Sequence, residues 1–342
     1  MRETSIEGFA FVGEELSFQP VHIEIRDGII SSVEDVRNPK KRWILPALFN
    51  AHTHIGDTVA MDVPLEGDLG MIVSPPDGLK HRILRATERG TLISAMHATI
   101  RFMEQSGCAG FADFREGGVE GVEALREAAA DCATQPVIFG REGGELRSEG
   151  YGISSVRDIT DLEPGIEAAR RAGHMIAIHA GERDADDIEG ALTYEPDLLI
   201  HCTHARRKDL RRCADEGIPI AICPRSNWIL GVTRSPDHPP VCEMIDLGCR
   251  VFLGTDNAMF VQPDLWREMA FLSVITDLSA RTILEMAISG SSLTGDSYRI
   301  EEGTKASIIE IDPMRSNLDF SRDPVRTLVT RGCSCHLDRI LF

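Results

Sequence analysis

The chain has 342 residues, too many for a minimal domain and about right for a large barrel with a small additional module. Its apolar fraction of 42% can fill a sizeable core. The formal net charge is −18, from 36 basic and 54 acidic residues, so the surface should repel nucleic acid and anionic membranes.

The nine cysteines form no regular framework, and Cys202 and Cys223 lie within apolar runs. We interpret the cysteines as reduced and buried, which favours a cytoplasmic protein. Cys333 and Cys335 are interpreted as strand residues. We find no apolar run near the ~20 residues that a membrane helix needs.

The two ends of the chain both have strand-like patterns. Residues 21–36 alternate apolar and polar positions around Arg26-Asp27-Gly28, which predicts a β-hairpin. Residues 306–312 and 324–330 are also predicted as strands. We therefore expect residues 1–44 and 304–342 to form one small β-sandwich domain.

The middle of the chain, residues 45–303, alternates short apolar strands with amphipathic helices such as 83–104 and 118–130. Eight strands separated by helices over this length predict an α/β fold, a (β/α)₈ TIM-type barrel of ~250 residues. The expected strands are 43–49, 110–114, 135–139, 150–156, 175–179, 198–201, 219–223 and 250–254.

Candidate metal ligands follow the first and fifth of these strands. His52 and His54 are two residues apart on a strand, so their imidazoles can point the same way. His179 ends the fifth strand, and Glu182 follows where the chain turns away from it. Glu182 could reach a water molecule at a metal without binding the metal, or could be an ordinary charge at a helix start.

The sixth and eighth strands add His201, His204 and Asp256. An acid at a buried strand end needs a partner, and a metal is the natural one. The carboxyl ends of all barrel strands share one face, where active sites form. The combination of four such strand ends predicts a metal-dependent active site more strongly than any single motif.

These motifs carry a family resemblance. His52-Thr-His54, His179-Ala-Gly-Glu182, His201-Cys-Thr-His204, Cys223-Pro-Arg-Ser-Asn227 and Gly254-Thr-Asp256 resemble the cytosine deaminase and chlorohydrolase branch of the amidohydrolase superfamily, which includes adenosine- and guanine-deaminase relatives. The resemblance implies a metal bound by His52, His54, His179 and Asp256, with Glu182 as the proton shuttle. It also implies a substrate-facing histidine after the sixth strand, which is His201 or, as the rival, His204.

One divalent metal ion is expected. Two-metal relatives commonly bridge their ions with a carboxylated lysine on the fourth strand, and this chain has no lysine between residues 81 and 207. A bridging glutamate at position 142, 145 or 149 is the alternative. Three histidines and one aspartate suit Zn²⁺, with Fe²⁺ as the second choice.

Further residues are candidates for substrate binding. His81 follows a Gly/Pro-rich loop, and Arg147 belongs to the glycine-containing loop 141–151, whose charges could grip a substrate or simply face solvent. Asn227 follows the seventh strand.

The expected reaction is hydrolytic deamination of an aminated N-heterocycle. Glu182 would protonate a ring nitrogen, Asp256 would accept a proton from the attacking water, and His201 would stabilise the developing oxyanion. The alternatives are a hydrolase that opens a cyclic amide and a non-catalytic metal-binding relative, and the intact Glu182 argues against the latter. The expected partner is a small-molecule substrate, and homo-oligomerisation is left open.

Overall fold

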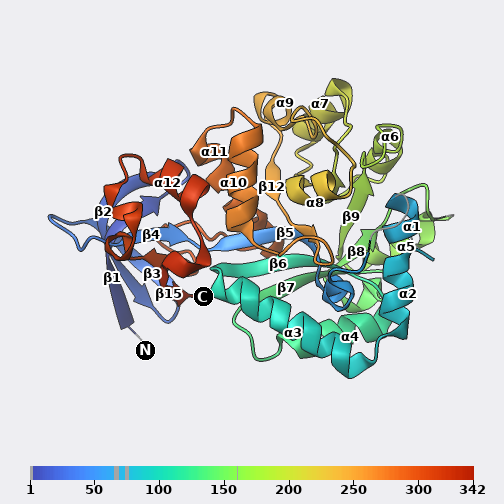
Figure 1. The fold of residues 1–342 in the computed structure, drawn as a ribbon, viewed down its shortest axis with the longest axis horizontal. Helices are drawn as coiled ribbons and strands as arrows, with labels where there is room; N and C mark the ends of the chain where they lie inside the picture. Colours follow the sequence, from blue (N-terminus) through green and yellow to red (C-terminus); the bar gives the residue numbers. More distant parts are fainter. Residues whose placement is uncertain (1–2, 65–68, 74–76, 160) are drawn as a thin grey trace.

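The computed structural model describes residues 3–64, 69–73, 77–159 and 161–342. A barrel of parallel strands surrounded by helices lies beside a smaller sheet that contains strands from both ends of the chain (Figure 1). No helix in these ranges is both long enough and apolar enough to cross a membrane.

The barrel sheet has nine strands, and every neighbouring pair is parallel. These strands are buried on both faces, which explains their continuous apolar runs. In chain order they are β5 (Leu48–His54), β6 (Cys108–Arg115), β7 (Gln135–Gly140), β8 (Gly150–Ile153), β9 (Met175–Ala180), β10 (Leu198–His201), β11 (Ile220–Ile222), β12 (Val251–Leu253) and β13 (Asp256–Asn257).

The last two of these strands close the barrel. Between them, the Gly254 amide donates to the carbonyl of Ile222 at 2.9 Å and the Thr255 amide donates to that of His52 at 3.0 Å. A side chain at Gly254 would lie 2.8 Å from the Cβ of His52, so the close approach requires glycine. β12 and β13 together are the expected eighth strand, and the (β/α)₈ prediction is confirmed.

Helices cover the outside of the barrel (Figure 1). The expected helix 118–130 is α4, but the expected helix 83–104 is divided, because the backbone is extended at Thr87 and Glu88. The α-helices of the barrel are α1 (Leu69–Val73), α2 (Leu79–Ala86), α3 (Arg89–Gln105), α4 (Gly118–Ala129), α5 (Glu163–Arg171), α6 (Ile188–Leu192), α7 (Arg207–Glu216), α8 (Pro224–Ile229), α9 (Val241–Asp246), α10 (Leu265–Ile275) and α11 (Ala280–Ile288).

The strands of the chain ends form one six-stranded sheet in the order β15-β14-β4-β1-β2-β3, rather than the two packed layers of a sandwich. The expected barrel strand 43–49 is divided between the two sheets, since its first part pairs with β1 and β14 and its second part begins β5. The bounds are β1 (Glu3–Val12), β2 (Ser17–Arg26), β3 (Ile29–Asp35), β4 (Trp43–Pro46), β14 (Ile308–Ile311) and β15 (Leu337–Leu341).

Two predictions near the C-terminus are wrong. Residues 324–330 belong to α12 (Pro324–Arg331), because Pro324 and the capping carboxylate of Asp323 start a helix there. Its buried residues, Val325, Leu328 and Val329, follow the period of a helix and pack toward α10 and α11. The other error is at Cys333 and Cys335, which are disulfide-bonded instead of lying reduced in a strand. Cys333 precedes a 3₁₀ turn, Ser334–His336, and Cys335 lies within it.

Candidate metal centre

Two histidines at the end of β5 begin the site. His52 is completely buried, and neither of its ring nitrogens has a hydrogen-bond partner in the described part of the chain. The Nδ1 of His54 lies 3.1 Å from both the Phe114 carbonyl oxygen and Glu116 Oε1. Its Nε2 is thereby turned toward Asp256, as expected when an outer carboxylate orients a metal-binding imidazole.

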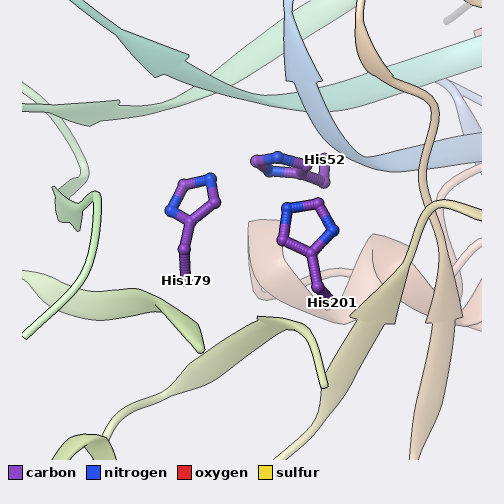
Figure 2. Close-up of side chains that lie close together, drawn as sticks. All are labelled: His52, His179 and His201. Atoms are coloured by element: carbon purple, nitrogen blue, oxygen red, sulfur yellow. The ribbon is translucent and has the colours of Figure 1, made fainter. Parts of the chain in front are cut away.

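His179 and His201 approach His52 from β9 and β10 (Figure 2). The ring centroids of His179 and His201 lie 4.9 Å and 5.6 Å from that of His52. The Nδ1 of His179 is 2.8 Å from the carbonyl oxygen of Ile153, which leaves its Nε2 as the free ligand atom. His201 has a φ of 73°, an uncommon value for a residue with a side chain, so its position is held by the surrounding structure.

Asp256 completes the cluster from β13. Its Oδ1 lies 3.2 Å from the Nε2 of His52 and 3.6 Å from the Nε2 of His54. Ser226 donates a hydrogen bond of 2.6 Å to the other oxygen, Oδ2. The φ of Asp256 is 61°, so this side chain too reaches the site from a strained backbone position.

The donor atoms suit a divalent metal ion. Those of His52, His54 and Asp256 all lie within 4.8 Å of one another, as do those of His52, His179 and His201. Burial lowers the pKa of His52 to about 4 and that of His54 to about 3, so both imidazoles are neutral at pH 7 and can act as ligands. The unpaired nitrogens of His52 give independent support for a bound cation.

Glu182 follows β9 and lines the cavity above these ligands. Its Oε1 is 3.9 Å from the Nε2 of His201. Burial raises the pKa of Glu182, and the nearby His201 only partly opposes the shift. The carboxyl group is therefore poised to hold and release a proton beside the metal ligands. The cavity opens to solvent, and its volume accessible to water-sized molecules is about 80 Å³.

The sequence prediction missed a buried ionic network behind His54. The Lys80 ammonium lies 2.9 Å from Asp57 Oδ2 and 2.8 Å from Glu116 Oε1, and Arg115 donates at 2.7 Å to Glu116 Oε2. Burial favours neutral Lys80, but the two carboxylates outweigh it and raise its pKa. A partial indication of this network was present in the sequence. Arg115 and Glu116 stand at the end of an apolar strand, where buried charges need partners.

The remaining candidates for substrate binding differ in whether they line the cavity. His81 lines the cavity and its Nε2 is 3.1 Å from the Val73 carbonyl oxygen. Arg147 is exposed in a 3₁₀ turn outside the described lining, which Arg141 of the same loop enters instead.

Two further candidates, His204 and Asn227, also lie outside the described lining. Asn227 is buried and donates at 2.8 Å to the hydroxyl of Thr203, so it supports the segment after β10. The ring of His204 packs beside that of His238, with centroids 5.2 Å apart. Of the two rival histidines, His201 is the one that joins the cluster. The glutamates considered as bridging ligands also lie outside the described lining and accept backbone hydrogen bonds: Glu142, Glu145 and Glu149.

Comparison with known proteins decides the family. A putative aminohydrolase of Methanothermobacter thermautotrophicus is 37% identical, over 93% of this chain and 92% of that protein. The chain belongs to the amidohydrolase superfamily. A second putative aminohydrolase, from Archaeoglobus fulgidus, is 31% identical over 96% of the chain and 91% of its own length. The family described as adenosine deaminase matches residues 157–306. This amidohydrolase is therefore an enzyme that hydrolyses carbon–nitrogen bonds.

More distant proteins share parts of the sequence or the fold. An adenine deaminase from Chelativorans sp. is 32% identical over 57% of each chain. A zinc-bound adenosine deaminase from Xanthomonas campestris superposes with a TM-score of 0.76 at 14% identity, over 98% of this chain and 91% of that one. A variant of the atrazine chlorohydrolase of Arthrobacter aurescens, complexed with zinc and atraton, has a TM-score of 0.81 at 16% identity, over 98% and 92% of the two chains.

Proposed function

We propose that this amidohydrolase deaminates a small aminated N-heterocycle at a metal site formed by His52, His54, His179 and Asp256. The observation that carries the proposal is the position of Glu182, a carboxyl group with a raised pKa on the cavity side of this ligand cluster. The adenine deaminase of Chelativorans and the adenosine deaminase family support an amino group on a ring as the point of attack.

We propose one zinc ion as the native metal. The imidazole-rich, buried ligand set and the zinc in the Xanthomonas and Arthrobacter structures support this choice. When bound, a divalent metal lowers the pKa of water from 15.7 toward ~7, which makes a hydroxide nucleophile available at neutral pH.

The protein's own residues then move protons. The nearby His52, His201 and His54 hold the pKa of Asp256 well below its usual value despite burial, so its carboxylate is ionised and can accept a proton from the attacking water. Glu182 delivers one proton to the ring nitrogen, so that the attacked carbon can become tetrahedral. The proton that Asp256 took from the water then passes by way of Glu182 to the amine, which leaves as ammonia. His201, 3.9 Å from Glu182, stabilises the oxygen that becomes negative.

The test is a panel of cytosine, adenine, guanine, their nucleosides, aminotriazines and cyclic amides, assayed with the metal-loaded enzyme. We expect ammonia release without ring opening. Ring opening without ammonia would instead identify a cyclic-amide hydrolase and overturn the proposal.

Glu182→Gln provides the matched test of mechanism. The amide keeps the shape but cannot shuttle protons, so kcat should fall by ~10²–10⁴-fold while metal content is unchanged. Glu189→Gln is the control, because Glu189 is exposed on α6 and pairs with Lys208. Loss of metal from Glu182→Gln would make Glu182 a ligand and would contradict the assigned role.

A further inference from the structure

Arg141 is a buried cation in the wall of the active-site cavity. It directly follows β7, at the carboxyl end of the third barrel strand, and only 7% of its surface is exposed. Its Cζ lies 5.9 Å from the ring centroid of Phe114, and that ring is 4.8 Å from the ring of His179. The guanidinium therefore shares a neighbour with the metal ligands.

Among the described residues, the guanidinium of Arg141 has no hydrogen-bond or ion-pair partner that the structure records. Its Nε and Nη2 are buried without any hydrogen bond, and we find no carboxylate within ion-pair distance among the described residues. Other cations of the lining differ in this respect, since Lys80 pairs with Asp57 and Glu116, and Arg157 pairs with Asp184. An unpaired buried charge is costly, so we expect a molecule that enters the cavity to supply its partner.

We infer that the substrate carries an anionic group, a carboxylate or a phosphate, that binds Arg141. This inference rests on the proposed deaminase function and specifies its substrate class. The planar guanidinium presents several donors in a fixed fork that matches two oxygens of such a group. Because Arg141 and His179 both lie against the ring of Phe114, an anion bound by Arg141 is close to the metal site.

The overall charge makes this recognition selective. With a net charge of −18 the protein as a whole repels anions, so a negative substrate needs a local cation that is free to pair with it. A substrate of the same shape without the charge would leave Arg141 buried and unpaired, and would bind less tightly.

Matched ligand pairs test the inference by calorimetry on the metal-loaded protein. 6-Aminonicotinate is compared with 6-aminonicotinamide for a carboxylate, and adenosine 5′-phosphate with adenosine for a phosphate. Inorganic phosphate and acetate are added as anions without a ring. At least one anionic ligand should bind about tenfold or more tightly than its neutral match, and the pair that responds identifies the anionic group.

Variants show whether Arg141 causes the preference. Arg141→Gln should abolish it, and Arg141→Lys should retain part of it because the charge remains. Arg171→Gln removes the same charge from an exposed position on α5 and should change nothing. Absence of any anion preference in the wild-type protein would overturn the inference, as would a preference that persists in Arg141→Gln and therefore comes from the metal. Binding without ammonia release would refute the deaminase proposal alone.

Discussion

His52 lies close to every other side chain of the proposed metal site. Its ring lies within 5.6 Å, centroid to centroid, of the rings of His54, His179 and His201, and it contacts Asp256. Four side chains from four strands thus surround one buried imidazole. Such crowding of titratable groups is unfavourable in a metal-free interior, and a cation bound by His52, His54, His179 and Asp256 would offset this cost.

His201 and His204 differ in their expected effect on catalysis. His201→Asn should lower kcat by roughly 10²-fold with metal content unchanged, because it removes the group that stabilises the developing oxyanion. His204→Asn should leave kcat close to the wild-type value, since His204 packs beside His238 outside the described lining. Steady-state kinetics with metal analysis checks both variants. The opposite pattern would exchange the two roles, and loss of metal in His201→Asn would make His201 a ligand.

At the scale of elements, residues at the end of β6 and at the start of α2 hold His54 of β5 in place. Glu116, just beyond β6, accepts from His54 and Lys80, so one carboxylate fixes both the ring of a ligand and a buried cation. The pKa of Glu116 is well below its usual value, because Lys80 and His54 together outweigh its burial. This carboxylate should therefore be ionised whenever the site is folded.

Glu116→Gln should weaken metal binding by roughly 10- to 100-fold, the usual effect of losing an outer partner of a ligand histidine. The amide keeps its size but loses the negative charge that orients His54 and balances Lys80. Competition with a chromogenic chelator measures the affinity, and Glu120→Gln on the exposed face of α4 is the control. Unchanged affinity would show that the Phe114 carbonyl alone orients His54.

For the whole molecule, the ligand set predicts one metal ion per chain. The fourth barrel strand, β8, has no lysine, and the glutamates at 142, 145 and 149 are engaged by backbone amides elsewhere. Metal analysis of protein purified without added metal should approach one equivalent, and chelation should lower Tm, because a ligand bound only by the folded state stabilises it. Two tightly bound ions per chain would refute this prediction.

Stability of the metal-free protein should depend on pH in a defined direction. The pKa values of His52 and His54 fall from 6.5 to about 4 and about 3 on folding, so below pH 6.5 the unfolded chain binds more protons than the folded one. The free energy of unfolding should therefore decrease as pH falls from 6.5, by about 2 kcal/mol per histidine at pH 5. Urea denaturation after chelation measures it. A variant with both His52→Gln and His54→Gln should show a smaller decrease in the free energy of unfolding as pH falls. A decrease equal to that of the wild-type protein would contradict the assignment of this pH dependence to the two histidines.

Local sequence patterns were sufficient to predict the barrel and the proposed metal ligands. Buried parallel strands are short apolar runs, and their carboxyl ends share one face, so His52, His54, His179 and Asp256 could be placed together before their distances were known. The hairpin 21–36 and the strand 306–312 were likewise visible as local patterns, but β1 and β15 were not predicted. Residues 324–330 were mistaken for a strand because a short apolar run fits both periods.

Only the tertiary structure placed residues whose roles depend on neighbours distant in sequence. Lys80 lies on a helix without a motif, and it is part of the site because β5 and β6 bring Asp57 and Glu116 to it. His204 was the rival of His201 in the sequence, and only His201, at the end of β10 with a positive φ, joins the cluster. Arg141 and Arg147 share one loop, and burial against Phe114 distinguishes them. Secondary structure follows from local periodicity, but the partners of a charged side chain are determined by packing between elements.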